Sequence, residues 1–220
     1  IEVVRIAPQK KEVVLVSGAL FGYGKLLIAS GGKVRKWGQV NDARWVHRLQ
    51  TLDDADRLEA ALSRITHPLV VGGSFIGLEF LEILIENNLS PILLLQGDFF
   101  FSEFIDSQGG ALIEENFRKY GIRLERNETI ARLTPHRPDA ASASGPKRLF
   151  EEASTEPRPT AEFEREYLEV VTQGMRQIFC DAILVGVGID RRISFLEGSD
   201  IMLGEKGIQV NEFLETNIED

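Results

Sequence analysis

Apolar residues follow two different periodicities along the chain, and together they predict an α/β fold. The short apolar runs at 69–71 and 91–95 are typical of strands in a parallel sheet that is covered on both faces. Residues 78–86 and 103–120 instead carry apolar side chains at helical spacing, and a further strand is expected at 122–125. The order strand–helix–strand–helix–strand predicts a Rossmann-like domain with a parallel sheet and right-handed crossovers.

A further helix is expected before this region, starting at Thr51. Thr51 is a favourable N-cap residue, and Asp54 stands where a capping box has Glu or Gln. Apolar residues follow at helical spacing over 58–65, and Pro68 is expected to end the helix.

The two ends of the chain follow another pattern, which predicts short β-strands. Segments 1–6, 12–16 and 25–28 are strand-like and are separated by glycines, and 207–211 has the same character. These ends are therefore expected to form a β-rich part that is separate from the Rossmann-like domain.

Residues 134–166 interrupt the pattern with five prolines among alanine, serine and glutamate. The segment offers little apolar surface to offset the entropy of ordering, which favours a low-complexity insertion without fixed structure. A partner-binding element or lid and a short strand at 148–150 are the alternatives. Strand-like runs at 167–171 and 182–187 then resume the domain.

Charge and composition narrow the classes of partner. A net charge of −9 disfavours nonspecific nucleic-acid binding, which needs several basic groups to neutralise phosphates. No apolar run is long enough to predict a membrane span. The single cysteine, Cys180, cannot form an intrachain disulfide, is expected to be buried, and fits a cytoplasmic or other reducing compartment. The three histidines show no ligand spacing, so no metal site is expected.

The candidate site is the glycine-rich turn that follows the strand at 69–71. A dinucleotide pyrophosphate needs N–H donors, which a helix N-terminus supplies together with a partial positive charge. Gly72 is suited to the tight turn and Gly77 to close helix packing, whereas Ser74 stands where glycine is usual. The predicted pyrophosphate-binding residues are consecutive: Gly72, Gly73, Ser74, Phe75, Ile76 and Gly77. The alternative is a turn that serves packing alone.

Gln96 ends the next strand, about twenty residues further on, where such domains contact the adenine ribose. An Asp or Glu there favours NADH, whereas glutamine can bond the ribose hydroxyls without repelling a 2′-phosphate. No arginine follows immediately to bind that phosphate. NAD(H) and NADP(H) both remain open as the cofactor, with a slight preference for NADH, and Gln96 as an ordinary strand-end residue is the alternative.

The run LVVGGSFIGLE at 69–79 resembles the nucleotide-binding segment of the pyridine nucleotide–disulfide oxidoreductase superfamily. It is most similar to the ferredoxin reductase, nitrite reductase and apoptosis-inducing-factor-like flavoproteins of that superfamily. Four other segments resemble the same group in the same order: 23–31, 49–56, 183–189 and 207–220.

The resemblance implies roles for three more residues. Glu79 occupies the family position near nicotinamide and flavin, and Gly186 and Gly188 lie on the strand whose glycines face the nicotinamide end. Each has a structural alternative. Glu79 in the first turns of a helix also interacts favourably with the helix dipole, and the two glycines can serve packing.

The resemblance also implies a domain plan. Residues 1–45 correspond to a remnant of an FAD-binding domain, 46–203 to an NAD(P)-binding domain with the insertion, and 204–220 to the return into the FAD-binding domain. The main flavin-binding motifs of the family would lie outside these residues. FAD is therefore expected only in the full-length protein, and this polypeptide alone is expected to bind no FAD and to be inactive.

The implied function is that of a FAD-dependent NAD(P)H oxidoreductase with an unidentified electron acceptor. No side chain of this chain need act as a general acid, because the hydride chemistry belongs to the cofactors. The alternative is a non-catalytic nucleotide-binding or scaffold module of the same fold. Ser74, Gln96 and the insertion at 134–166 motivate that alternative.

Overall fold

The computed structural model describes residues 1–35, 37, 42, 44–137, 166–205 and 207–219. The chain forms two compact units, of which one comprises Ile1–Arg35 with Ile189–Asp220 and the other Lys36–Gly188. The domain limits expected at 45 and 203 stay a prediction, and the compact units divide after Arg35 and Gly188.

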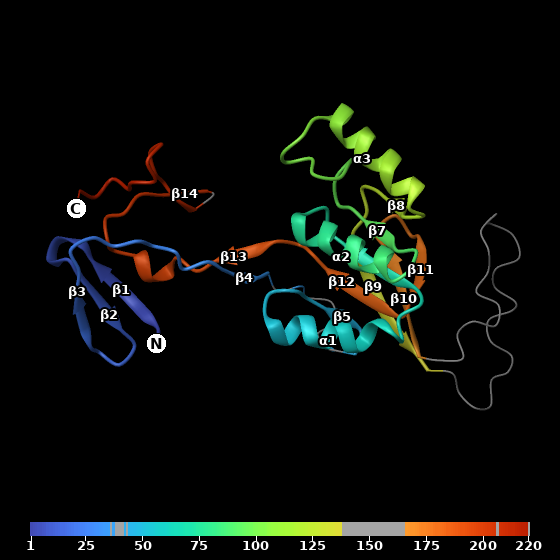
Figure 1. The fold of residues 1–220 in the computed structure, drawn as a ribbon, viewed down its shortest axis with the longest axis horizontal. Helices are drawn as coiled ribbons and strands as arrows, with labels where there is room; N and C mark the ends of the chain where they lie inside the picture. The colour runs from blue at the N-terminus through green and yellow to red at the C-terminus, as the bar shows by residue number, and fades with distance from the viewer. Residues whose placement is uncertain (36, 38–41, 43, 138–165, 206, 220) are drawn as a thin grey trace, which may run out of the picture. The chain divides into compact units, whose positions relative to one another are not determined.

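A parallel sheet of five strands forms the centre of the larger unit and confirms the predicted Rossmann-like fold (Figure 1). In spatial order the strands are β5 (Val46–His47), β12 (Ala182–Val185), β6 (Pro68–Val71), β7 (Ile92–Leu94) and β8 (Arg123–Glu125). All residues of β6 and β12 are buried, as expected for central strands that are covered on both faces.

Three helices cover one face of this sheet: α1 (Leu52–Leu62), α2 (Phe75–Glu86) and α3 (Ser107–Lys119). Because successive side chains of a strand point to opposite faces, Val70 of β6 packs with the helices while Leu69 and Val71 pack on the other side. No helix among the described residues is long and apolar enough to cross a membrane.

An antiparallel sheet covers the second face of the parallel sheet. Its strands lie in the order β11 (Gln177–Cys180), β10 (Tyr167–Thr172) and β9 (Ile130–His136). Leu168 and Val170 of β10 join the same buried cluster as Ile183 of β12. Cys180 is buried there, as predicted, and burial raises the pKa of its thiol.

The expected start of the insertion at residue 134 was wrong, because β9 extends to His136. Residues 134–136 pair with β10 up to His136, opposite Tyr167, and are therefore part of the sheet. Pro135 is tolerated because β9 is an edge strand of this sheet. The rest of the predicted insertion, with the possible strand at 148–150, lies outside the described residues apart from its two ends.

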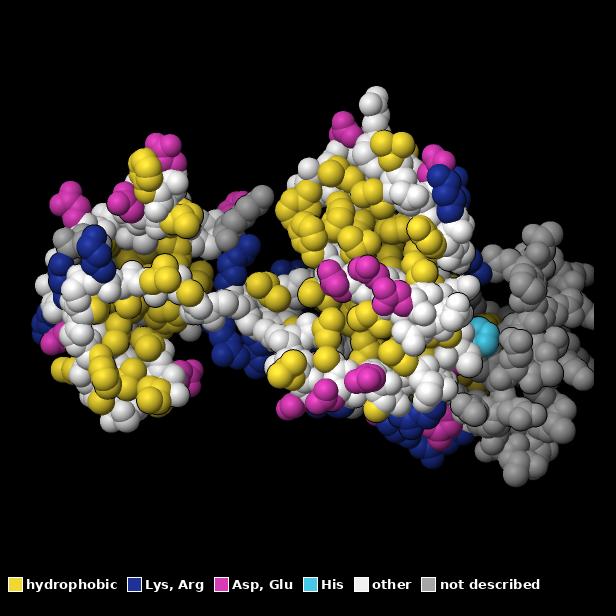
Figure 2. Space-filling model, in the orientation of Figure 1, with side chains coloured by type: hydrophobic (Ala, Val, Ile, Leu, Met, Phe, Trp, Pro, Cys, Tyr) yellow, Lys and Arg dark blue, Asp and Glu magenta, His cyan; other side chains and the backbone are white. Residues whose placement is uncertain are grey.

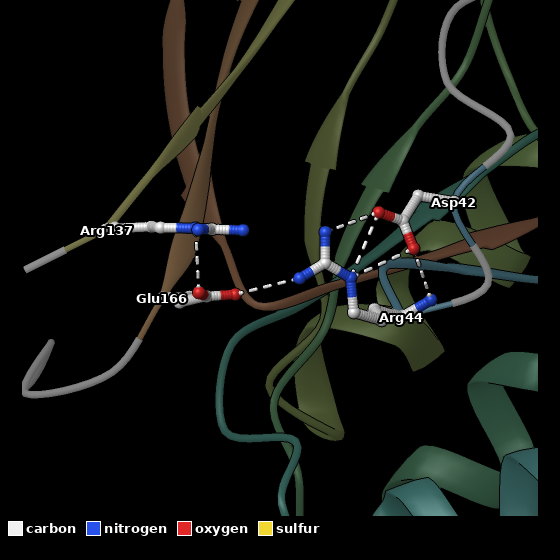
Figure 3. Close-up of polar contacts among 4 residues, drawn as sticks. All are labelled: Asp42, Arg44, Arg137 and Glu166. Carbon is white, nitrogen blue, oxygen red and sulfur yellow. Dashed lines mark hydrogen bonds and ion pairs between the residues drawn. The ribbon is translucent and has the colours of Figure 1, made fainter.

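Charged side chains link the ends of β9 and β10 to the segment before β5 (Figure 3). Glu166 accepts from Arg137 at 2.9 Å and pairs with Arg44 at 3.4 Å, and Arg44 pairs with Asp42 at 2.7 Å. The arginine side chains are largely exposed, so these pairs contribute little to stability.

The smaller unit is β-rich, as the sequence indicates. Strands β1 (Val3–Ala7), β2 (Glu12–Leu15) and β3 (Leu20–Gly22) form an antiparallel sheet, and a short 3-10 helix, η1 (Pro8–Lys10), joins the first two. The other strands form two pairs, β4 (Gly32–Val34) with β13 (Ile189–Arg191) and β14 (Leu203–Gly204) with β15 (Gly207–Ile208). A second 3-10 helix, η2 (Ser194–Leu196), follows β13 along the chain and precedes β14.

Two strand predictions in this unit were wrong. Residues 25–28 form no strand. The third strand of this sheet is instead Leu20–Gly22, which pairs with β2 after the chain reverses at Gly18, whose φ is +82°. The expected strand at 207–211 is limited to β15, whose pairing with β14 ends at Ile208.

Two helix boundaries also differ from the prediction. Helix α1 ends at Leu62, and Pro68 instead begins β6. The Asp181 carboxylate accepts the N–H groups of Thr66 at 2.7 Å and His67 at 2.9 Å and so holds the segment that leads into β6. Helix α3 begins at Ser107 because Asp106 caps it and accepts from the Gly109 N–H.

The predicted helix start at Thr51 is confirmed, with both arms of a capping box. The Thr51 hydroxyl accepts from the Asp54 N–H at 3.2 Å, and the Asp54 carboxylate accepts from the Thr51 N–H at 3.0 Å. Partial burial opposes ionisation of Asp54, but hydrogen bonds from Thr51, Arg57 and Gln50 outweigh it and hold the pKa of Asp54 below its usual value.

We expect Asp54→Asn to destabilise the chain by about 1 kcal/mol at pH 7, a typical value for a lost helix cap. Because the folded-state pKa is lowered, the carboxylate stabilises the fold above its unfolded pKa of about 3.9 and loses this effect as the pH falls through the folded value. Urea unfolding of wild type and variant at pH 7 and pH 3 tests this. An equal difference at both pH values would contradict the assignment.

Candidate dinucleotide site at the carboxyl edge of the parallel sheet

The predicted turn lies between β6 and α2, which is the strand–turn–helix setting that a dinucleotide fingerprint requires. Gly72 continues the sheet for one residue, because its N–H donates to the Leu94 carbonyl at 3.0 Å. Its φ of +109° then turns the chain in a way that favours glycine. Ser74 is the N-cap of α2, and Phe75 is the first residue of the helix.

Three glycine positions meet here with no space for a side chain. A Cβ atom on Gly72 would lie 2.4 Å from the Gly186 carbonyl oxygen, and one on Gly77 would lie 2.3 Å from the Gly72 carbonyl oxygen. A Cβ on Gly186 would lie 2.7 Å from the Gly77 nitrogen. The packing role that the sequence left open for Gly186 is thus present, and the same close packing is what a dinucleotide turn requires.

The Ser74 side chain has a role that the sequence did not predict. Its hydroxyl donates to the Gly186 carbonyl at 2.6 Å and accepts from the Gly77 N–H at 3.3 Å. The side chain is therefore directed toward β12. The sequence identified Ser74 only as a departure from glycine, and the partner at residue 186 is far away along the chain.

The N-terminus of α2 offers free hydrogen-bond donors. The backbone N–H groups of Ser74, Phe75 and Ile76 have no acceptor in the part of the chain that the structure describes. These donors sit at the positive end of a helix of 12 residues. Gly73 lies beside them and contributes no side chain.

Exposed side chains surround this turn. Phe75 is 61% exposed, and its ring centroid lies 4.7 Å from that of Phe101 and 5.5 Å from that of Phe104. Glu79, one turn further along α2, is exposed. Figure 2 shows apolar side chains gathered on the face of the larger unit that carries α2 and α3, with acidic side chains beside them.

Gln96 is exposed just after β7, at the same edge of the sheet as the turn. The end of β8 lies beside it, because the Asn127 N–H donates to the Gly97 carbonyl at 3.3 Å. Arg126 therefore neighbours this position from the next strand, and it pairs with the buried carboxylate of Glu114. Arg126 does not follow Gln96 in the sequence, and its place near Gly97 depends on the order of β7 and β8 in the sheet.

The other end of the site is the turn after β12. Gly186 is buried and its N–H donates to the Val71 carbonyl at 2.8 Å. Gly188 is exposed, has a φ of +87°, and has open space where a Cβ would lie. Gly188 is thus not a packing glycine in the described structure.

The titratable side chains near this edge form no metal site. Burial lowers the pKa of His47 at the end of β5, and the charges of Arg64 and Arg57 lower it further, so this imidazole is neutral at pH 7. Within the described ranges, no group of three or more His, Cys, Asp or Glu side chains is arranged to hold a metal ion.

The chain is similar in sequence to a subunit of an NADH-dependent dehydrogenase and to a reductase. It is 24% identical to the NADH-dependent phenylglyoxylate dehydrogenase subunit epsilon of Aromatoleum evansii, over 93% of this chain and 42% of that protein. It is 25% identical to the peroxisomal monodehydroascorbate reductase 1 of Arabidopsis thaliana, over 100% of this chain and 46% of that protein. The chain thus spans less than half the length of these relatives.

The fold is similar to that of a solved ferredoxin reductase. The crystal structure of the ferredoxin reductase for the CYP199A2 system from Rhodopseudomonas palustris superposes with a TM-score of 0.71 at 20% identity. The alignment covers 98% of this chain and 47% of that one. The sequence profile of the pyridine nucleotide-disulphide oxidoreductases matches residues 1–220. The suspected resemblance is confirmed, and the chain belongs to the pyridine nucleotide-disulphide oxidoreductase family.

Proposed function

We propose that this chain is the NAD(P)H-binding portion of a FAD-dependent oxidoreductase. The observation that carries the proposal is the turn at 72–77, where close-packed glycines and free N–H donors meet at the start of α2. When bound, the nicotinamide would supply a hydride to the flavin of the full-length protein, and the reduced flavin would then give up electrons to an acceptor. The residues of this chain bind and orient the dinucleotide.

The turn fits a pyrophosphate in charge and in shape. Three backbone N–H groups, of Ser74, Phe75 and Ile76, are free to donate, and the helix dipole adds a partial positive charge. The Ser74 hydroxyl points to Gly186, so it does not obstruct the approach of a phosphate. A local site of this kind needs no basic side chains, which reconciles anion binding with a net charge of −9.

The adenosine end of the site accepts either dinucleotide. Gln96 can bond the ribose hydroxyls and carries no charge that would repel a 2′-phosphate, while the Arg126 side chain from the neighbouring strand is paired with the buried carboxylate of Glu114. The Aromatoleum relative is NADH-dependent, which supports NADH as the cofactor. At the other end, we assign Gly188 and Glu79 to the nicotinamide side, a proposal that the family resemblance and the exposure of both residues support.

Two points extend beyond this chain. The relatives are about twice as long, and we propose that FAD is bound by the full-length protein and not by this polypeptide alone. The similar Rhodopseudomonas protein is a ferredoxin reductase, which supports a ferredoxin-type electron acceptor.

A non-catalytic scaffold is the second candidate function, and one of the three features that favoured it, Ser74, no longer does so. Ser74 was a reason for it as a departure from the glycine pattern, and the inward direction of its hydroxyl removes that reason. Gln96 and the insertion are the features that still favour it. Dye reduction with NADH and added FAD by the full-length protein separates the two, because a scaffold would bind without turnover.

The Phe75→Pro variant tests pyrophosphate binding, because it removes one N–H donor from the turn. Proline is favourable at the first position of a helix, and Ser74 has the extended φ of −106° and ψ of 174° that a residue before proline requires. We therefore expect the fold to persist and affinity for NADH to fall about tenfold, the effect of one lost hydrogen bond to a charged group.

Phe75→Ala is the matched control, because it removes the ring and keeps the N–H. Calorimetric titration with NADH compares the two variants, and thermal unfolding checks that both are folded. If the alanine variant lost as much affinity as the proline variant, the ring and not the N–H would be responsible, and the phosphate assignment would fail.

The second prediction concerns the choice of dinucleotide. We expect Gln96→Glu to raise the ratio of NADH affinity to NADPH affinity about tenfold, because a carboxylate repels the 2′-phosphate. Gln96→Ala is expected to leave this ratio near the wild-type value. Titration of each variant with both dinucleotides gives the ratio, and an unchanged ratio in the glutamate variant would show that residue 96 does not face the ribose.

A further inference from the structure

We propose that Ser74 is a positioning residue that couples the two ends of the dinucleotide site. Its hydroxyl ties the pyrophosphate turn at the start of α2 to the turn after β12, where Gly186 and Gly188 lie. The inference rests on the proposed function and assigns to the serine a part that glycine at the same position cannot take.

The hydroxyl of Ser74 both donates and accepts a hydrogen bond. It donates to the Gly186 carbonyl at 2.6 Å, a short distance for a hydrogen bond between oxygens. It accepts from the Gly77 N–H at 3.3 Å, which is the N-cap bond of α2. One side chain therefore joins the helix start to the end of β12.

Gly186 is held on both of its backbone groups. Its N–H donates to the Val71 carbonyl at 2.8 Å, and its carbonyl accepts from Ser74. No space remains on its third side, because a Cβ there would lie 2.7 Å from the Gly77 nitrogen. The peptide plane that follows Gly186 is thus fixed by residues of the pyrophosphate turn.

This fixed plane sets the direction of the chain into Gly188. Gly188 has a φ of +87° and no atom within 4 Å of a built Cβ, and the residue after it, Ile189, pairs with Val34 of β4. On the side of the dinucleotide turn, the position of Gly188 depends on Gly186, the anchored residue two places before it. Loss of the Ser74 hydroxyl therefore frees the nicotinamide-side turn, while the N–H donors of the pyrophosphate turn stay in place.

The test compares NADH with ADP, which has the adenosine and pyrophosphate but lacks the nicotinamide half. Ser74→Gly removes the hydroxyl and keeps an acceptable N-cap residue, Ser74→Ala removes the hydroxyl only, and Ser74→Thr keeps a hydroxyl. We expect the glycine and alanine variants to lose about tenfold in NADH affinity and less than about twofold in ADP affinity. The threonine variant is expected to retain both.

Amide hydrogen exchange of the chain without nucleotide gives a second readout. Exchange at Gly186, whose N–H donates to the Val71 carbonyl at 2.8 Å, is expected to be about tenfold faster in the glycine and alanine variants than in wild type and threonine. An unchanged ratio of NADH to ADP affinity in Ser74→Gly, in a wild type that binds both, would overturn this inference alone. A wild-type chain that binds neither ligand would overturn the proposed function and this inference with it.

Discussion

The larger unit depends on the close approach of three backbone segments at Gly72, Gly77 and Gly186. Because no side chain fits between them, the end of β6, the start of α2 and the end of β12 meet through backbone atoms. This contact brings the first turn of α2 close to the carboxyl edge of the parallel sheet. The free N–H donors of the helix are thereby presented at the edge where open α/β sheets bind their ligands.

The burial of the sheet on both faces supports this arrangement. Helices α1 to α3 cover one face and the antiparallel sheet β9–β11 covers the other, so β6 and β12 are held in an apolar core. The backbone groups at their carboxyl ends are then the part of these strands that can meet a ligand. Local dipoles, rather than net charge, make the site suitable for an anion in an acidic chain.

The sequence predicted the elements whose cause is local. The apolar run before Gly72, the capping residues Thr51 and Asp54, and the burial of Cys180 all follow from residue type and spacing, and the structure confirms them. Features that depend on distant residues were missed. The Asp181 carboxylate accepts from the N–H groups of Thr66 and His67, which lie 115 and 114 positions away along the chain, and holds the segment that leads into β6.

The same division applies to the candidate site. The turn at 72–77 was found from its spacing, whereas the bond from Ser74 to Gly186 joins residues 112 positions apart and has no signal in a single sequence. Arg126 was missed for the same reason, because only sheet order brings it beside Gly97.

The most direct test of dinucleotide binding is an NMR titration of the backbone amides with NADH. The account predicts saturable shifts that are largest at Ser74, Phe75 and Ile76, and absent shifts there, or shifts confined to the smaller unit, would contradict it.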